Sequence, residues 1–187
     1  KQQKDVIKGG EFIIRETNPE EIFIPEQISE EQRLMKESCH DFVEQEVIPR
    51  GNDLDEQVNL LKEAAELGIV GANIPEEYGG MELGPITTAY ILDELGRGGG
   101  SFSTTLGAHT GIGMLPILYF GTDDQKEKYL PKLSDAEWQA SYCLTEPEAG
   151  SDALSAKTTA KATDDGEASL LNGQKIWPSN AGFADLF

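Results

Sequence analysis

Two stretches in the last part of the chain carry side chains that could hold a polar ligand. The first is YCLTEPEAGSD, at positions 142–152, which places the hydroxyls of Thr145 and Ser151 on a turn rich in proline and small residues. Gly150 leaves the neighbouring backbone N–H groups unhindered, so a phosphate or the polar edge of an electron-rich ring could approach closely. The alternative is a capped turn in which Asp152 bonds to its own backbone, and these residues alone favour it.

The second stretch is KIWPSNAGFADLF, at positions 175–187. Trp177 offers a large flat face beside the hydroxyl of Ser179. A tryptophan of this kind is more often part of a core. Two segments that each end in a hydroxyl, with an indole between them, could nonetheless hold a flat heteroaromatic cofactor.

Helical patterns fill the chain upstream of both stretches. Two of them begin with a capping box, formed by Ser29 with Gln32 and by Thr122 with Gln125. The predicted helical segments are 29–49, 53–67, 85–95, 101–120 and 122–133. Together they predict a bundle of about five helices.

The segment 101–120, SFSTTLGAHTGIGMLPILYF, has no charged residue and is small or apolar on every face. A helix that is apolar all round is typically buried, so we expect this one at the centre of the bundle, kinked or divided at Pro116. The run GRGGG at 96–100 follows a helix and not a strand. We therefore expect a hinge or a tight link there and not a dinucleotide fingerprint.

The period of the sequence changes after Trp138. SYCLT, at 141–145, is a predicted strand, and AKTTAKAT, at 156–163, alternates with period two. The run 164–166, Asp-Asp-Gly, is a turn signal, and Asn172-Gly173 predicts a type I′ hairpin. The sequence thus predicts an α+β fold: an all-α helical-bundle N-terminal domain followed by the start of an antiparallel β domain. We expect the remainder of that domain to lie beyond Phe187.

Composition excludes several classes of function. Fifteen basic and 34 acidic residues among 187 give a net charge of −19, which repels the phosphates of nucleic acids and anionic lipid heads. No apolar run is long enough to span a membrane, and no secretory signal is visible. Cys39 and Cys143 are too few and too far apart for a disulfide framework, and His40 and His109 have no second ligand at the spacing of a metal site. We expect a reducing, cytoplasmic compartment.

Both stretches, together with the upstream LGAHTGIGMLPILYFGTDDQKEKYLPKL, resemble the acyl-CoA dehydrogenases. The resemblance extends from about Ser29 onward in the order of that family, a helical domain and then a β domain. It divides the chain into a lead-in at 1–28, an N-terminal helical domain at 29–135 and the beginning of the middle β domain at 136–187. It is closest to the branch that acts on long and very long acyl chains, which carries a similar LGAH stretch.

The resemblance implies FAD as cofactor and gives individual residues a role. Thr145 would bond the pyrimidine end of the flavin, and Ser151 a cofactor phosphate or the pantetheine of the substrate. Trp177 would pack against the ring, and Ser179 would bond its N5 atom. The implied cofactor contacts are Tyr142, Leu144, Thr145, Gly150, Ser151, Trp177 and Ser179.

The implied reaction is the α,β-dehydrogenation of a long-chain fatty acyl-CoA to a trans-2-enoyl-CoA in fatty acid β-oxidation. Removal of the weakly acidic α-proton needs an oriented carboxylate. In the family this glutamate lies in a C-terminal helical domain, so we expect it beyond Phe187 and expect the fragment by itself to be inactive. Glu146 and Glu148 are not expected to serve as the base, because they lie in the cofactor-binding turn.

The uncharged segment bears on the choice of substrate. Ser103 and Gly107 lie one turn apart and share a helix face. The resemblance implies that this face, together with Ser151, contacts the substrate, and that small side chains here leave a deep channel for a long acyl chain. Close helix packing is an equally good reason for small residues at these positions.

Three positions depart from the pattern of the family: Glu148, Pro178 and Ala181. Pro178 removes a backbone N–H beside the predicted flavin site. Two other functions therefore stay open, an acyl-CoA oxidase-like flavoprotein and a non-catalytic acidic helical interaction domain. The expected partners are a fatty acyl-CoA, an electron-transfer flavoprotein and further copies of the chain in a homo-oligomer.

Overall fold

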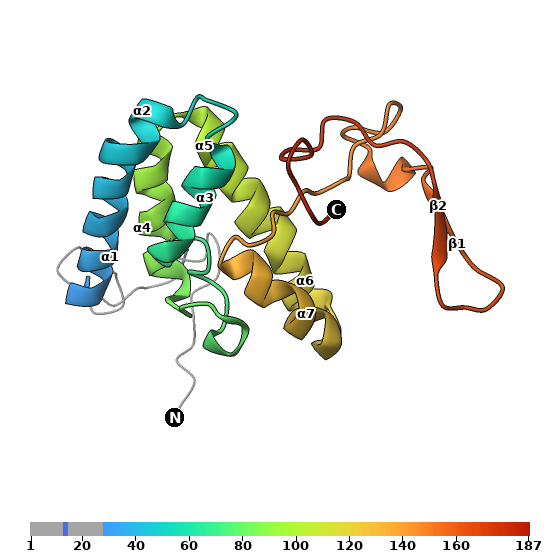
Figure 1. The fold of residues 1–187 in the computed structure, drawn as a ribbon, viewed down its shortest axis with the longest axis horizontal. Coiled ribbons are helices and arrows are strands. Elements are labelled where there is room, and N and C mark those ends of the chain that lie inside the picture. Colours follow the sequence, from blue (N-terminus) through green and yellow to red (C-terminus); the bar gives the residue numbers. More distant parts are fainter. Residues whose placement is uncertain (1–12, 15–27) are drawn as a thin grey trace.

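The computed structural model describes residues 13–14 and 28–187, so the predicted lead-in at 1–28 lies almost entirely outside the described residues. A helical body precedes a projecting two-stranded segment (Figure 1), which confirms the predicted α+β class. The α-helices are α1 (Glu30–Phe42), α2 (Ile48–Arg50), α3 (Gln57–Glu66), α4 (Gly84–Arg97), α5 (Gly100–Gly107), α6 (Leu115–Phe120) and α7 (Asp123–Ser134). The strands are β1 (Thr159–Ala162) and β2 (Ser169–Asn172). Shorter helical turns are η4 (Val43–Val47), η5 (Glu76–Tyr78), η6 (Ala108–Met114) and η7 (Ala153–Ser155).

Both predicted capping boxes are confirmed. The Ser29 hydroxyl accepts from the Gln32 N–H at 3.1 Å, and Gln32 Oε1 accepts from the Ser29 N–H at 3.0 Å. Thr122 and Gln125 exchange the same pair of bonds at 3.3 and 2.9 Å at the start of α7. Each box satisfies N–H groups that a helix start leaves without intrahelical partners.

The uncharged segment forms α5, the π-helical turn η6 and α6 in succession. Its first part is buried in the bundle, where the ring of Phe102 meets that of Phe42 edge-on at 6.1 Å. Pro116 lies in the first turn of α6, directly after the π-helical turn η6, so the expected division falls where the helix type changes. The expectation of burial on every face is wrong, because Thr104 and Ile112 are exposed and Phe120, in the last turn of α6, is 86% exposed.

The link between α4 and α5 is tighter than the predicted hinge at 96–100. Helix α4 continues through Gly96 to Arg97, and only Gly98 and Gly99 separate it from α5. Gly99 adopts φ 96°, a conformation that favours glycine. A Cβ on Gly98 would lie 2.7 Å from a methyl group of Val47, so glycine also permits close packing there.

The two strands pair antiparallel, from Thr159 opposite Asn172 to Ala162 opposite Ser169. The predicted 164–166 turn joins them, and the Asp165 carboxylate stabilises it by accepting from the Glu167 N–H at 3.1 Å. The reversal predicted at Asn172-Gly173 is wrong, because that pair lies where β2 ends. A Cβ on Gly173 would lie 2.2 Å from Thr158 Oγ1, so close packing and not a turn explains this glycine.

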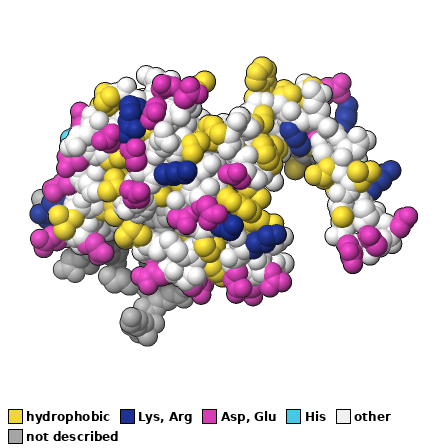
Figure 2. Space-filling view, in the orientation of Figure 1, with side chains coloured by type: hydrophobic (Ala, Val, Ile, Leu, Met, Phe, Trp, Pro, Cys, Tyr) yellow, Lys and Arg dark blue, Asp and Glu magenta, His cyan; other side chains and the backbone are white. Residues whose placement is uncertain are grey.

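The strand predicted over 141–145 is also not formed. Only isolated bridges flank it, between Ala140 and Leu186 and between Glu146 and Ala149. The residues of β1 and β2 are exposed on both faces of the hairpin. Figure 2 shows the hairpin projecting from the helical body, with acidic side chains spread over the visible face of that body.

His109 joins the helical body to the β segment. Its ring is fully buried, with Nε2 2.9 Å from the Leu133 carbonyl oxygen and Nδ1 3.0 Å from the Ala140 nitrogen. A backbone N–H can only donate, so Nδ1 accepts from Ala140 and the proton is on Nε2. Burial lowers the pKa of His109, and the neutral ring therefore holds the start of the β segment against η6 and α7.

Replacing His109 by leucine leaves the buried Ala140 N–H without its acceptor, which we expect to cost about 2 kcal/mol of stability. The wild-type contribution is full above the ordinary imidazole pKa of 6.5 and is lost as the pH falls through 6.5 toward the lowered pKa. Between about pH 7 and pH 5 the free energy of unfolding should fall more steeply for the wild type than for His109→Leu. Chemical denaturation followed by circular dichroism measures both curves, and parallel curves would contradict this role.

Candidate cofactor site

The two stretches singled out by their chemistry lie side by side and run in opposite directions. The Ser141 hydroxyl donates to the Ser179 carbonyl at 2.6 Å. Four residues further on, the Thr145 carbonyl accepts from the Ile176 N–H at 2.8 Å. Thr145 and Ile176 are 31 positions apart in the sequence, and this bond brings them together. Trp177, the next residue after Ile176, therefore lies near Thr145.

Asn180 fixes the second stretch to the helical body. Its side-chain amide donates to the Thr105 carbonyl at 2.9 Å and to the Ala140 carbonyl at 3.2 Å. Its backbone has φ 68°, a left-handed conformation that asparagine tolerates better than most residues. Asn180 was not among the predicted site residues, and only its place beside Ser179 gave a signal.

The turn of the first stretch is closed by its own backbone. Glu146 and Ala149 exchange reciprocal N–H to carbonyl bonds of 3.1 and 3.2 Å. Asp152 instead accepts from the Ser155 hydroxyl. The loop is therefore closed by the bonds between Glu146 and Ala149, and not by a bond from the Asp152 side chain to its own backbone.

Several polar groups along the two stretches are available to a ligand. Within residues 28–187, the side-chain hydroxyls of Thr145, Ser151 and Ser179 form no hydrogen bond, and neither do the backbone N–H groups of Gly150 and Ser151. Gly150 and Ser151 are exposed, and a Cβ on Gly150 would meet no atom within 4 Å. Unpaired donors beside open space fit phosphate oxygens or the polar edge of a ring.

Trp177 is not a core residue. Its side chain is 87% exposed and its backbone has φ 56°, directly before Pro178. A left-handed backbone is costly for a bulky residue and is found where the surrounding structure enforces it, often in ligand sites. The exposed indole therefore offers a free flat face at the position predicted for a ring contact.

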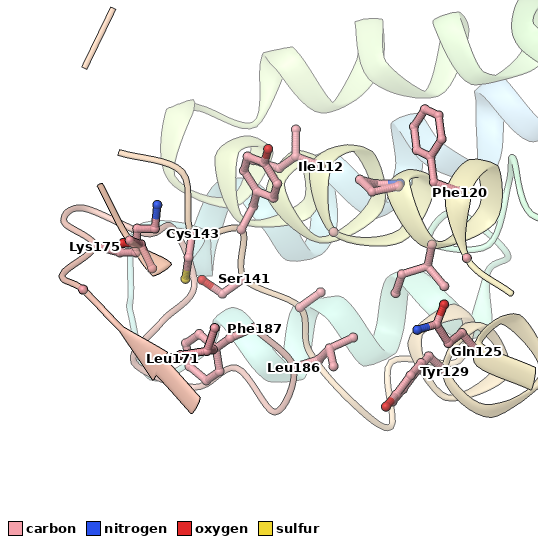
Figure 3. A pocket seen from close by; sticks show the side chains of 18 residues that line it. Ile112, Phe120, Gln125, Tyr129, Ser141, Cys143, Leu171, Lys175, Leu186 and Phe187 are labelled. Carbon is pink, nitrogen blue, oxygen red and sulfur yellow. The ribbon is translucent and has the colours of Figure 1, made fainter. Parts of the chain in front are cut away.

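A cavity of about 780 Å³ lies between the helical body and the β segment. Tyr142 is the predicted site residue that lines it, together with Ser141, Cys143 and Lys175. Figure 3 shows Ile112 and Phe120 on the helical wall, and Leu171 and Phe187 across from them. The predicted set did not include these apolar residues, because they come from η6, α6, β2 and the last residue described and lie far apart in the sequence.

Ser103 and Gly107 lie away from this cavity. The Ser103 hydroxyl donates to the Leu95 and Gly99 carbonyls, both at 2.7 Å, so it helps to close the link between α4 and α5. Gly107 is half-buried, and a Cβ on it would meet no atom within 4 Å. A substrate contact by either residue stays a prediction.

Glu146 is buried, and its charge is strongly stabilised. Hydrogen bonds from Lys175, then from the Thr158 hydroxyl and the Lys157 N–H, lower the pKa of Glu146 to about 2. A carboxylate with so low a pKa is a poor proton acceptor near neutral pH. That the catalytic base is a residue other than Glu146 stays a prediction.

Another ionisable pair joins two helices of the helical body. His40 Nδ1 lies 2.9 Å from a Glu94 carboxylate oxygen, between α1 and α4. In the part of the chain that the structure describes, no group of histidine, cysteine and acidic side chains could hold a metal ion. Nor is any helix of the described residues long and apolar enough to cross a membrane.

Two family profiles match the chain. The one described as "Acyl-CoA dehydrogenase, N-terminal domain" matches residues 29–137, more than half of the sequence. The one described as "Acyl-CoA dehydrogenase, middle domain" matches residues 141–187. The chain belongs to the acyl-CoA dehydrogenase family.

Similar proteins cover both regions. A probable acyl-CoA dehydrogenase of Bacillus subtilis is 45% identical across 100% of this chain and 32% of its own length. The human very long-chain specific acyl-CoA dehydrogenase, a mitochondrial protein, is 41% identical across 87% of this chain and 26% of its own. The crystal structure of an acyl-CoA dehydrogenase from Bacillus anthracis complexed with FAD is 46% identical, with a TM-score of 0.90 over 96% of this chain and 32% of that one. The chain thus spans about a quarter to a third of these relatives.

Gly113 sets how closely the helical wall of the cavity approaches the β segment. A Cβ on Gly113 would lie 2.6 Å from Ala140 Cβ, whereas one on Gly111, in the same η6 turn, would meet nothing within 4 Å. We expect Gly113→Ala to destabilise the chain by about 1–3 kcal/mol through overpacking. Gly111→Ala should be neutral or stabilising by up to about 1 kcal/mol. Equal midpoints in urea denaturation of the two variants would contradict this packing.

Proposed function

We propose that the chain is the N-terminal part of an FAD-dependent acyl-CoA dehydrogenase that acts on long-chain fatty acyl-CoA thioesters. The observation that carries the proposal is the pairing of 141–145 with 175–180, which gathers unbonded hydroxyls and an exposed indole in one place. The relative from Bacillus anthracis, at 46% identity, is described as complexed with FAD. The division into domains at 29–135 and 136–187 remains a prediction.

The residues of this chain fit FAD. The free N–H groups of Gly150 and Ser151 suit its phosphates, and Trp177 offers a flat face to its ring system. The hydroxyls of Thr145 and Ser179 can donate to the polar edge of the ring. A bound FAD would supply the acceptor for the hydride removed from the β-carbon of the substrate, and the protein would contribute position and hydrogen bonds. Tyr142 and Leu144, which are both partly exposed, complete the proposed contacts.

The base for the α-proton is proposed to come from a part of the protein beyond this chain. Glu146 is held as a carboxylate by its hydrogen bonds, and Glu148 is an exposed residue paired with Lys157. The relatives are three to four times as long as the matched region, which leaves room for a further domain. We propose an electron-transfer flavoprotein as the electron acceptor, a homo-oligomeric assembly and a cytoplasmic location.

We expect the intact protein to bind FAD and Trp177→Ala to weaken the binding about tenfold, or about 1.4 kcal/mol, because a stacked aromatic face is lost. The other tryptophan, Trp138, packs against Tyr129 and Lys132 in the helical body and supplies the control. Trp138→Phe should leave the affinity unchanged. Titration of the apoprotein with FAD, followed by flavin fluorescence, measures both. If Trp177→Ala binds as tightly as the wild type, the indole is not a cofactor contact.

Long-chain specificity is tested at Gly107, where the helix face is open. In the intact enzyme, Gly107→Leu should lower the ratio of kcat/KM for a sixteen-carbon over an eight-carbon acyl-CoA by about tenfold or more, because it shortens the channel. Gly96→Leu is the matched control, since Gly96 is exposed on α4 and a Cβ there meets nothing within 4 Å. An unchanged ratio in Gly107→Leu would remove this residue from the substrate site.

The reduced flavin also distinguishes the alternatives. A dehydrogenase reacts slowly with oxygen, whereas an acyl-CoA oxidase allows oxygen to reach the ring. Stopped-flow reoxidation of the substrate-reduced intact protein therefore separates the two. A protein that purifies colourless and binds no added FAD would instead support a non-catalytic interaction domain.

A further inference from the structure

Glu146 is a charged side chain in a place where charges are rare. The residue is 7% exposed, and its carboxylate accepts four hydrogen bonds. They come from the Lys157 N–H at 2.6 Å, the Thr158 N–H at 3.0 Å, the Thr158 hydroxyl at 2.5 Å and the Lys175 ammonium at 2.8 Å. Charge-assisted bonds of this number hold a side chain in one geometry. None of the roles considered above uses this arrangement.

Lys175 connects Glu146 to the second stretch. Its ammonium donates to Glu146 and also to the Leu144 carbonyl at 3.0 Å. The next residue, Ile176, donates its N–H to the Thr145 carbonyl at 2.8 Å. Three consecutive residues of the first stretch are thus bonded to two consecutive residues of the second.

No strand ladder supports this region. The segment 141–145 forms no strand, and the nearby hairpin of β1 and β2 is exposed on both faces. Within the described residues the sheet has two strands, and a sheet of this size is marginal by itself. Because Glu146 also accepts from residues 157 and 158, its carboxylate joins the first stretch, the residues that precede β1 and the residues that follow β2.

We propose that Glu146 and Lys175 form a clamp that positions Thr145 and Trp177 for the flavin. Both clamp residues are close in sequence to a proposed cofactor contact. Glu146 directly follows Thr145, and Lys175 lies two residues before Trp177. The inference rests on the proposed function for the identity of the ligand, but the clamp itself is a property of this chain. Glu146 and Lys175 act through their neighbours and are positioning residues.

Glu148 shows why burial matters. It lies in the same turn and pairs with Lys157, but both side chains are 74% exposed. An exposed pair contributes little to order, because water screens it and because two long side chains must be immobilised. Removing one partner of a buried pair, by contrast, leaves an uncompensated charge. The clamp is therefore assigned to Glu146 and not to Glu148.

Hydrogen exchange of the protein without FAD tests the clamp independently of any ligand. Glu146→Gln and Lys175→Met should each accelerate exchange of the Ile176 N–H, which bonds to Thr145, by about tenfold or more through local opening. The control is Glu137→Gln, which removes an exposed carboxylate 3.4 Å from its single lysine partner, Lys132. Exchange of amides in α4 should stay unchanged in all variants, which shows that the helical body is folded.

Titration of the intact protein with FAD tests the positioning role. Glu146→Gln should raise the Kd for FAD about tenfold, because only the fraction of molecules with an ordered site binds. Lys175→Arg preserves the charge and should restore most of the affinity that Lys175→Met loses. If Lys175 served only overall stability, its variants would shift the midpoint of unfolding. Well below that midpoint, Lys175→Arg and Lys175→Met would then have the same affinity for FAD.

The outcomes separate the two hypotheses. Faster exchange at Ile176 together with weaker FAD binding supports the clamp and its role. Unchanged exchange in Glu146→Gln overturns the clamp, whatever the protein binds. Faster exchange with unchanged FAD affinity overturns the positioning role. If the wild type binds no FAD although exchange at Ile176 responds to the variants, the proposed function fails and the clamp remains as a structural device.

Discussion

The bonds of one buried, neutral imidazole fix where the helical body ends and the cofactor segment begins. His109 accepts from the Ala140 N–H through one ring nitrogen and donates to the Leu133 carbonyl through the other. Ala140 lies two residues before the first polar stretch, so its position determines where Ser141 and Tyr142 lie. Asn180 reinforces this junction from the second stretch by bonding the same residue. Through these bonds the two stretches meet the helical body at η6 and at α5.

Local signals in the sequence predicted the helices well, because they act over three or four residues. The capping box of Ser29 and Gln32 needs only its own backbone. Turn signals were less reliable, because only the first of the two predicted reversals is formed. The side chain of Asp165 stabilises the turn between β1 and β2 by hydrogen bonds within it. Gly173 instead allows the backbone to pack closely against Thr158. The sequence alone could not distinguish a glycine required in a tight turn from a glycine required for close packing.

The candidate site was predictable in part for the same reason. Thr145, Ser151 and Ser179 were recognisable because hydroxyls cluster beside glycine and tryptophan within short stretches. Ile112 and Leu171, which face the same cavity, are separated by 59 positions, and no local pattern relates them. Trp177 needed the structure as well, since an aromatic residue in a sequence is usually a core residue, and here it is largely exposed. Long-range pairing decides both cases.

The two strands of the hairpin differ in charge. β1 carries Lys161, and Lys157 lies just before it, whereas β2 reads Ser-Leu-Leu-Asn and has no charge. Charged side chains discourage another strand from pairing with an edge, and their absence invites it. Leu170 and Leu171 are 69% and 72% exposed, so the β2 side also gains apolar contacts when it is covered. A further strand would therefore pair with the free edge of β2 and not with that of β1.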